Sequence, residues 1–321
     1  MIVLVAALLA ACATPAERFD RRANALGFSA IGLQGAGFHH VAYVAGAFER
    51  SDTLHVYIEH DGMPWLDFTH PAADPTPRSP LALELMAEDS GPRLFLGRPC
   101  YFAPKEEPRS ICTPLLWTHL RYSPEVVASM VAALRRFLER HPFRRVVLIG
   151  YSGGGTLAWL MAAHVPETAA IVTVAANLDT DDWTRIHDYS PLAGSLNPAL
   201  MPQLPPTISQ VHYVGGRDRN VPPSVVQSFA RRHPEARVIE LADFDHECCW
   251  IERWPNLLEE AQGTRLRPSP ARLNGDQELP AYRSAQIVSG LKLGFIFCRS
   301  VEPTVFSAPA RGAVTRRIRY Q

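Results

Sequence analysis

The stretch VVLIGYSGGG, residues 146–155, decides the fold class of this chain. Its first four residues are apolar and predict a buried strand, and residues 150–154 (GYSGG) then fit the pattern G-x-S-x-G. Helix-forming residues follow at 155–164. In such a strand–turn–helix junction the serine lies on a tight turn, and flanking glycines are needed because side chains there would collide. The pattern predicts that Ser152 lies at the carboxyl edge of a sheet, where the first helical N–H groups also point.

Two nucleotide-binding motifs share these glycines, and neither fits. A P-loop requires a lysine after its last glycine, and Thr156 occupies that position. A dinucleotide fingerprint can be drawn through Gly153, Gly155 and Ala158. Asp179 would be its ribose-binding acid, but the fingerprint has to begin directly after its strand, and two residues intervene here. The sequence therefore predicts no nucleotide cofactor.

The overall composition excludes several classes of protein. The 321 residues carry 32 Lys and Arg against 32 Asp and Glu, so no broad positive charge favours nucleic acid as a partner. The apolar run at 2–11 is only half as long as the ~20 residues that a membrane-spanning helix needs. Residues 264–321 carry ten basic and three acidic side chains among several prolines. We expect residues 263–321 to form a basic, poorly ordered tail.

Elsewhere, apolar runs of strand length alternate with helical patterns. Glycines in the segment 35–37 predict a hairpin, and the apolar spacing over 124–140, with Ser123 as N-cap, predicts a helix. Continuous apolar strands between helices predict an α/β fold with a mostly parallel sheet of about eight strands and helices on both faces. The predicted strands are 28–34, 38–45, 54–59, 94–97, 146–149, 170–175, 211–214 and 238–241, and the other predicted helices are 155–164, 224–232 and one from 249 that bends at Pro255.

A serine nucleophile needs a histidine base and an acid that orients it. His246 follows the last predicted strand, whereas the other four histidines after Ser152 fall in helices, in a strand or in a proline-rich connector. For the acid, Asp218 lies on a glycine-rich loop between a predicted strand and a helix. Asp179 is the alternative acid, one strand earlier in the chain. We favour Asp218 because prolines follow it and fix its loop.

Three segments together resemble the α/β-hydrolase superfamily: the turn at 150–154, the G-x-D-x-x-V-P-P run at 216–223 and the Asp-His pair at 245–246. The resemblance covers residues 28–262, and we place the catalytic domain at 19–262. It implies an α/β-hydrolase fold with little or no lid. It also implies a serine hydrolase that cleaves small-molecule carboxylic esters through a Ser-His-Asp triad and an acyl-enzyme intermediate, without a cofactor. Peptidases, thioesterases and acyltransferases share this triad, and a non-catalytic binding module on the same fold is a further alternative.

The superfamily places one oxyanion-hole amide on the loop after its third strand, commonly introduced by His-Gly. The matching segment here is HDGM at 60–63. By position, the resemblance implies the Met63 N–H as one donor and the Gly153 N–H as the other, with Gly62 as the alternative to Met63. Asp61 is unusual beside a site that stabilises anions, and its carboxylate is expected to point away from that site.

The connector at 176–207 is where the superfamily inserts helical lids, and it is too short for a large cap. Four of its side chains have two possible roles. They either line an acyl or alcohol pocket or seal the edge of the sheet, and both roles stay open: Trp183, Tyr189, Leu192 and Leu196.

The apolar residues 2–11, followed by Cys12 and Ala13, resemble a bacterial lipoprotein signal peptide, in which the cysteine is acylated after cleavage. The resemblance implies export, lipidation of Cys12 and a membrane anchor formed by residues 1–18. Ala13 is typical of sorting to the outer membrane, on its periplasmic side. No Lys or Arg precedes the apolar run, which departs from the pattern. An ordinary cleaved secretory peptide is the alternative.

Export would place the remaining cysteines in an oxidising compartment. Cys100 and Cys112 flank a charged, proline-containing stretch typical of a surface loop, and we expect a disulfide between them. His246, Cys248 and Cys249 resemble half of a zinc site, but no second ligand pair is evident. We therefore expect no metal, and the pairing of the other cysteines stays open.

Overall fold

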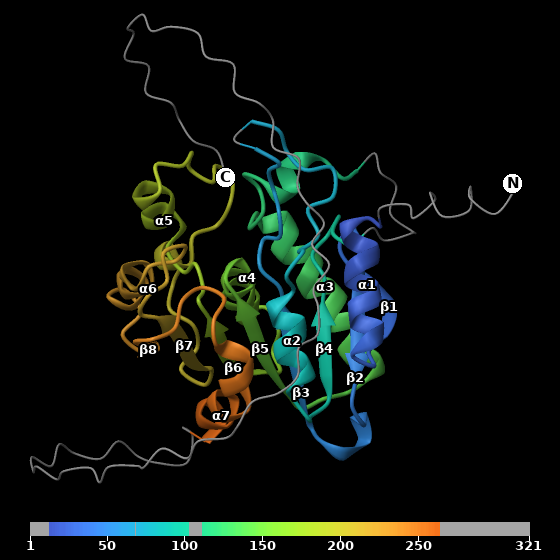
Figure 1. Cartoon of the computed structure of the whole chain (residues 1–321). Helices are drawn as coiled ribbons and strands as arrows, with labels where there is room; N and C mark the ends of the chain where they lie inside the picture. Colours follow the sequence, from blue (N-terminus) through green and yellow to red (C-terminus); the bar gives the residue numbers. More distant parts are fainter. Residues whose placement is uncertain (1–12, 68, 103–110, 264–321) are drawn as a thin grey trace, which may run out of the picture. The chain divides into compact units, whose positions relative to one another are not determined.

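The structure is a computed structural model that describes residues 13–67, 69–102 and 111–263. At its centre is an eight-stranded sheet (Figure 1), whose strands are β1 (Ser29–Gln34), β2 (His39–Ala45), β3 (Thr53–Ile58), β4 (Arg93–Leu96), β5 (Arg145–Tyr151), β6 (Thr168–Val174), β7 (Ser209–Gly215) and β8 (Arg237–Leu241). They lie in the order β1-β2-β4-β3-β5-β6-β7-β8. β2 is antiparallel to β1 and β4, and all other neighbours are parallel. The predicted mostly parallel sheet of eight strands is confirmed.

The central strands are buried because their sequences are largely apolar. Every residue of β6 is buried, and in β5 only the first residue is exposed. The edge strand β8 instead consists of exposed and half-buried residues. Helices cover both faces of the sheet (Figure 1), which is the environment that continuous apolar strands require. The carboxyl ends of the parallel strands meet at one edge, where the loops after β3, β5, β7 and β8 carry the candidate site residues.

Seven α-helices lie within the described residues: α1 (Pro15–Ala25), α2 (Leu81–Ala87), α3 (Pro124–Arg140), α4 (Gly153–Ala162), α5 (Thr180–Ile186), α6 (Pro223–Ala230) and α7 (Trp250–Gly263). The helix predicted over 124–140 is confirmed with the same bounds. The Ser123 hydroxyl caps it by accepting a hydrogen bond from the Val126 N–H at 3.3 Å. The helices α4 and α6 lie within two residues of their predictions, and α7 contains Pro255 as expected.

The helices α1, α2 and α5 were not predicted from the sequence. The first of them, α1, begins within the residues 1–18 that the sequence assigned to the anchor region. It starts with a capping box, in which Thr14 and Glu17 exchange hydrogen bonds of 3.2 and 2.8 Å. Phe19 is buried against Phe95, with ring centroids 5.2 Å apart. The helix α1 therefore packs on the same hydrophobic core as the sheet.

The connector between β6 and β7 contains only α5 and a short 3₁₀ turn at Pro198–Leu200. Since all of its residues are described, the expectation of little or no lid is confirmed. A disulfide joins Cys100 to Cys112, as expected, with an S–S distance of 2.03 Å and a Cα–Cα distance of 5.5 Å. Cys12 and the tail from 264 onward lie outside the described residues, so lipidation and the character of the tail stay predictions. No helix in the described ranges is long and apolar enough to cross a bilayer.

Candidate active site

Ser152 lies between the last residue of β5 and the first residue of α4, at φ 51° and ψ −123°. Residues other than glycine rarely adopt a positive φ. The backbone of Ser152 is therefore strained, and the surrounding structure has to hold it in this conformation. The Ser152 N–H donates to the Val174 carbonyl at 2.9 Å, which ties the turn to β6. A Cβ added to Gly150 would lie 2.3 Å from the Gly154 carbonyl oxygen. The glycine before the turn is therefore required by close packing.

His246 and Asp218 form a hydrogen-bonded pair across two loops. The Nδ1 of His246 lies 2.7 Å from Oδ2 of Asp218, which accepts the ring proton. The other carboxylate oxygen, Oδ1, accepts the N–H groups of Asn220 and Val221, both at 2.8 Å. The Asp218 side chain is fully buried, and these three N–H donors fix its position and orientation. This arrangement directs Nε2 of His246 away from the carboxylate, as a catalytic base requires.

Asp179, the alternative acid, has a different set of partners. It is the N-cap of α5, and its Oδ1 accepts hydrogen bonds from the Asp182 N–H at 3.2 Å and the Asn197 side chain at 3.0 Å. Its Oδ2 accepts the Ser228 hydroxyl at 2.7 Å. Asp179 therefore links α5 to α6 and, through Asn197, to the 3₁₀ turn at Pro198–Leu200. His246 pairs with Asp218 and not with Asp179.

Ser152 and His246 line the same pocket, which has a volume of about 750 Å³. Tyr151 lies beside both, and its ring centroid is 5.1 Å from that of His246. Within the described part of the chain, neither Ser152 Oγ nor His246 Nε2 has a hydrogen-bond partner. Catalytic hydrogen bonds commonly tighten only when substrate is bound. The geometry brings nucleophile and base to one pocket wall and leaves both reactive atoms available.

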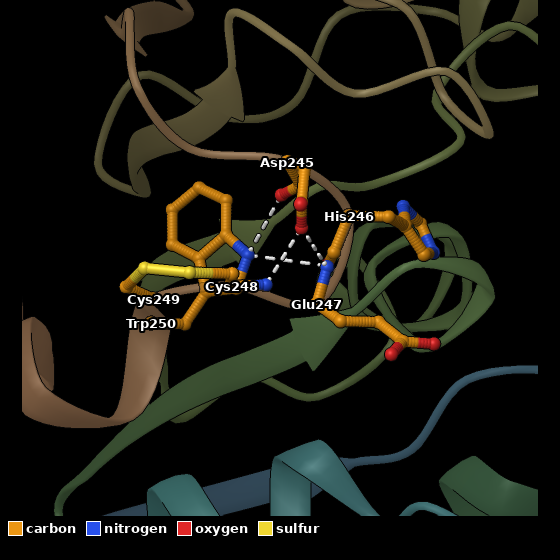
Figure 2. Close-up of a disulfide and its surroundings, with 6 residues drawn as sticks. All are labelled: Asp245, His246, Glu247, Cys248, Cys249 and Trp250. Carbon is orange, nitrogen blue, oxygen red and sulfur yellow. Dashed lines mark hydrogen bonds between the residues drawn. A yellow bond between two sulfur atoms is a disulfide. The ribbon is translucent and has the colours of Figure 1, made fainter.

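The loop that carries His246 is held by several hydrogen bonds around Asp245 (Figure 2). The Asp245 carboxylate accepts the N–H groups of Glu247 and Cys248 at 2.9 and 2.7 Å, and these bonds lower its pKa. The Trp250 indole N–H lies 3.1 Å from the carbonyls of both Asp245 and His246. The adjacent residues Cys248 and Cys249 are joined by a disulfide, a pairing that the sequence left open. No group of three or more potential metal ligands lies together in the described ranges.

The oxyanion-hole donor expected at Met63 requires a correction. The Met63 N–H donates to the Pro75 carbonyl at 3.0 Å. The alternative, Gly62, donates its N–H to Nδ1 of His60 at 3.1 Å. The loop turns back at Gly62, where φ is +67° and a Cβ would lie 1.9 Å from the Pro75 oxygen. Neither amide is therefore available to a substrate, because the loop pairs with the chain around Pro75.

Asp61, in the same loop, contacts Gly153, the residue after the nucleophile. Its Oδ1 approaches Gly153 so closely that a Cβ on that glycine would lie 2.1 Å away. Arg98 Nη2 lies 2.7 Å from Oδ1, and Oδ2 accepts hydrogen bonds from Arg121 at 3.1 Å and from the Tyr122 hydroxyl at 2.6 Å. Burial alone would raise the pKa of Asp61, but these three partners lower it to about 2. The carboxylate is ionised at neutral pH and is held by these three partners, and Asp61 and Arg121 both line the pocket.

Two of the four connector side chains line the pocket, and all four pack on the hydrophobic core. Trp183 and Tyr189 line the pocket, with ring centroids 5.6 Å apart. The Trp183 indole N–H is held by the Asn220 carbonyl at 2.7 Å. Leu192 and Leu196 pack against the hydrophobic core and are not among the residues that line the pocket. The pocket is therefore walled by aromatic side chains on the α5 side.

Arg98, Arg121 and Tyr122 could not be predicted as site residues from the sequence. No motif marks them, because they come from the loops after β4 and before α3, far from Ser152 in the chain. The only feature of the sequence that pointed to such partners was Asp61, since a buried carboxylate requires cationic or hydrogen-bonding partners.

Comparisons with known proteins support the fold. A family model described as the alpha/beta hydrolase fold matches residues 105–205. An esterase from Pyrococcus furiosus has a TM-score of 0.52 and 14% identity over 76% of this chain and 92% of its own. A serine hydrolase homologue from Coxiella burnetii has a TM-score of 0.50 and 15% identity over 74% of this chain and 96% of its own. For an acylaminoacyl peptidase from Pyrococcus horikoshii these values are 0.50 and 12%, over 77% of this chain and 43% of its own. No curated protein matches the sequence. The fold is that of the α/β hydrolases, and likenesses at this level of identity show nothing about the substrate.

Proposed function

We propose that the protein is a serine hydrolase that cleaves carboxylic esters of small or medium size. The observation that carries the proposal is the hydrogen bond from His246, which lines the pocket that contains Ser152, to the buried Asp218 carboxylate. The strained turn at Ser152 and the position of the Gly153 N–H at the first residue of α4 support the same chemistry. The α/β-hydrolase fold supports a hydrolase in general, and an esterase is among the similar solved proteins.

In the proposed reaction, Ser152 Oγ attacks the carbonyl carbon while its proton passes to Nε2 of His246. The carbonyl π electrons move to the oxygen, and this oxyanion accepts the Gly153 N–H. When the tetrahedral intermediate collapses, the alcohol leaves with the proton from Nε2, and an acyl-enzyme remains. Water then attacks the acyl group with His246 again as the base, which releases the acid and restores Ser152. Asp218 orients the imidazole throughout and stabilises the imidazolium.

A peptidase is the alternative with a specific observation in its favour, since an acylaminoacyl peptidase is among the similar solved proteins. Thioesterase and acyltransferase activities use the same triad. Matched p-nitrophenyl esters, anilides and thioesters with the same acyl group separate these possibilities. We expect the ester to be turned over fastest, and faster turnover of the anilide would make the protein a peptidase.

The decisive experiment measures turnover of p-nitrophenyl esters of graded acyl length by the full chain and by the Ser152→Ala variant. We expect measurable hydrolysis that falls by about 10⁴-fold or more in the variant, because nucleophile and base act as a unit. The matched control is Ser195→Ala, since Ser195 bridges the Tyr122 N–H and the His119 carbonyl and is not among the residues that line the pocket. Equal activity of the wild type and Ser152→Ala would contradict the proposal.

We propose further that the protein is exported and lipid-anchored through Cys12 on the periplasmic side of the outer membrane. The support is the sequence around Cys12 and the disulfide between Cys100 and Cys112, a bond typical of oxidising compartments. In the Cys12→Ser variant the protein is expected in the soluble periplasmic fraction. Unchanged association with membranes would instead assign the attachment to another segment.

A further inference from the structure

The disulfide between Cys248 and Cys249 lies directly after the loop that carries His246 (Figure 2). A disulfide between distant residues stabilises a protein mainly by closing a long loop of the unfolded chain. This one closes no such loop, because its two cysteines are adjacent in the sequence. Its effect is therefore local, since it closes a small ring that contains the peptide group between Cys248 and Cys249.

Cys248 holds one end of the turn that carries the base. The Asp245 N–H donates to the Cys248 carbonyl at 3.0 Å, and the Cys248 N–H donates to the Asp245 carboxylate at 2.7 Å. Only His246 and Glu247 lie between the two ends of this turn. The Cys248 carbonyl belongs to the peptide group inside the disulfide ring. The ring therefore limits the directions in which this hydrogen-bond acceptor can point.

Cys249 connects the turn to the interior of the protein. It is half-buried and packs against the hydrophobic core. The next residue, Trp250, is fully buried at the start of α7, and its ring lies on that of Phe244 with centroids 4.8 Å apart. The disulfide ring thus links the His246 turn to a fixed point of the fold.

The base tolerates little movement of this turn. Nδ1 of His246 lies 2.7 Å from Oδ2 of Asp218, and its Nε2 has to reach the Ser152 hydroxyl during the reaction. Displacement of a catalytic group by about 1 Å can lower a rate by about 100-fold. Opening the disulfide ring would release one end of the His246 turn and so change the position of the imidazole.

The disulfide is also accessible from solvent. Cys248 is exposed, and it lines a second cavity of about 650 Å³ that His246 lines as well. Exposed disulfides are reduced more readily than buried ones, because the attacking thiolate has to reach a sulfur atom. A small thiol can therefore enter beside the catalytic base.

We propose that Cys248 and Cys249 form a thiol–disulfide exchange site and that, while oxidised, they are positioning residues for His246. The reductant is a dithiol. One of its thiolates attacks the sulfur of Cys248, the S–S bond breaks, and Cys249 leaves and takes up a proton. The second thiolate of the reductant attacks the mixed disulfide, Cys248 leaves and is protonated, and the dithiol becomes a disulfide. The cysteine pair thus gains the electrons and protons that the dithiol loses. This inference rests on the proposed serine hydrolase function.

The test measures kcat, KM and the rate at which a fluorophosphonate labels Ser152, before and after treatment of the full chain with dithiothreitol. Alkylation and mass spectrometry identify the reduced cysteines, and the Tm of each sample reports its folding. One double variant removes the exchange site, Cys248→Ser with Cys249→Ser. The matched control removes the other disulfide, Cys100→Ser with Cys112→Ser.

In the wild type and the matched control, we expect reduction to lower kcat and the labelling rate by about 10-fold to 100-fold. KM should stay nearly unchanged, because the base is displaced while the pocket is retained. Reoxidation should restore both rates. The variant that lacks Cys248 and Cys249 should have the lower kcat from the outset and should not respond to dithiothreitol.

Full kcat in folded wild-type protein with Cys248 and Cys249 reduced would overturn the inference, and so would full kcat in the variant that lacks them. Free thiols at these two positions before reduction would overturn it as well. Sensitivity to dithiothreitol that is absent from the matched control would belong to Cys100 and Cys112 and would have the same consequence. If the wild type hydrolyses no ester in either state, the proposed function fails instead. The alkylation pattern still reports the exchange, so the two failures are distinguishable.

Discussion

Replacing Asp218 by asparagine is expected to lower kcat/KM for any accepted ester by about 10⁴-fold, or about 5.5 kcal/mol of transition-state stabilisation. Oδ1 of Asp218 accepts two N–H groups at 2.8 Å, from Asn220 and Val221. The variant must keep its carboxamide oxygen at that position, because its NH₂ group would face two donors there. The NH₂ group then faces His246, which lies 2.7 Å from Oδ2 in the wild type. The imidazole proton moves to Nε2, and an imidazole in this tautomer cannot accept the proton of Ser152.

The assay is initial-rate hydrolysis of a p-nitrophenyl ester, with thermal unfolding measured on the same samples. Asp179→Asn is the matched control. It disturbs the N-cap of α5 and the contact with Ser228 but nothing at His246, so its kcat/KM should fall by less than about 10-fold while its Tm decreases. The reasoning is refuted if folded Asp218→Asn retains a tenth of the wild-type activity, or if Asp179→Asn is the more damaged of the two.

Three further changes test the account of stability. Burial lowers the pKa of His40 to about 4 and that of His212 to about 3, below the unfolded value of 6.5. The unfolded chain therefore binds protons that the folded chain does not, and the free energy of unfolding should fall from pH 6.5 downward, by about 2 kcal/mol for each histidine at pH 5. Urea titrations at pH 7.5 and 5 measure this, and equal stability at both would contradict it. Serine at both Cys100 and Cys112 should lower the free energy of unfolding by about 3 kcal/mol, whereas no change in urea midpoint would mean that the bond is not formed in the native protein. Gly150→Ala should lower the free energy of unfolding by about 1–3 kcal/mol or more, because its Cβ would lie 2.3 Å from a backbone oxygen. A Tm equal to that of the wild type would show that the turn is packed less tightly than this distance indicates.

The sheet was predictable because its strands are determined locally. Residues 146–149 are apolar without interruption, and Thr173 is the only polar residue in 170–175; such segments are stable only when both faces are covered. The helix α3 was predicted with its bounds because Ser123 and Pro124 lie next to each other at its start. In each case the residues that determine the element are contiguous in the chain.

The helix α2 escaped prediction because its N-terminal cap is remote. Pro80 precedes it and provides no side-chain hydrogen bond. The buried Glu59 carboxylate, at the end of β3, accepts the N–H groups of Ala82 and Leu83, both at 3.2 Å. Local capping patterns cannot reveal a cap that comes from more than twenty residues away.

In the candidate site, too, the features determined by contiguous residues were predicted and those determined by remote contacts were not. The elbow at Ser152 and the loops of Asp218 and His246 are marked by glycines and by their positions after strands, so the sequence placed them. The Met63 assignment was wrong because its N–H pairs with Pro75, a contact set by the path of the loop. Transferring a donor by position assumed a loop of the usual shape, and here the loop turns at Gly62 and pairs with Pro75.

Labelling of the full chain with a fluorophosphonate, followed by mass spectrometry of its peptides, tests the central claim most directly. The account predicts one adduct per chain, on Ser152, formed at a rate that falls sharply in His246→Gln because the serine loses its base. Loss of ester hydrolysis should follow the extent of labelling. An adduct on another residue, or a chain that hydrolyses esters after complete labelling of Ser152, would contradict the assignment of Ser152 as the nucleophile.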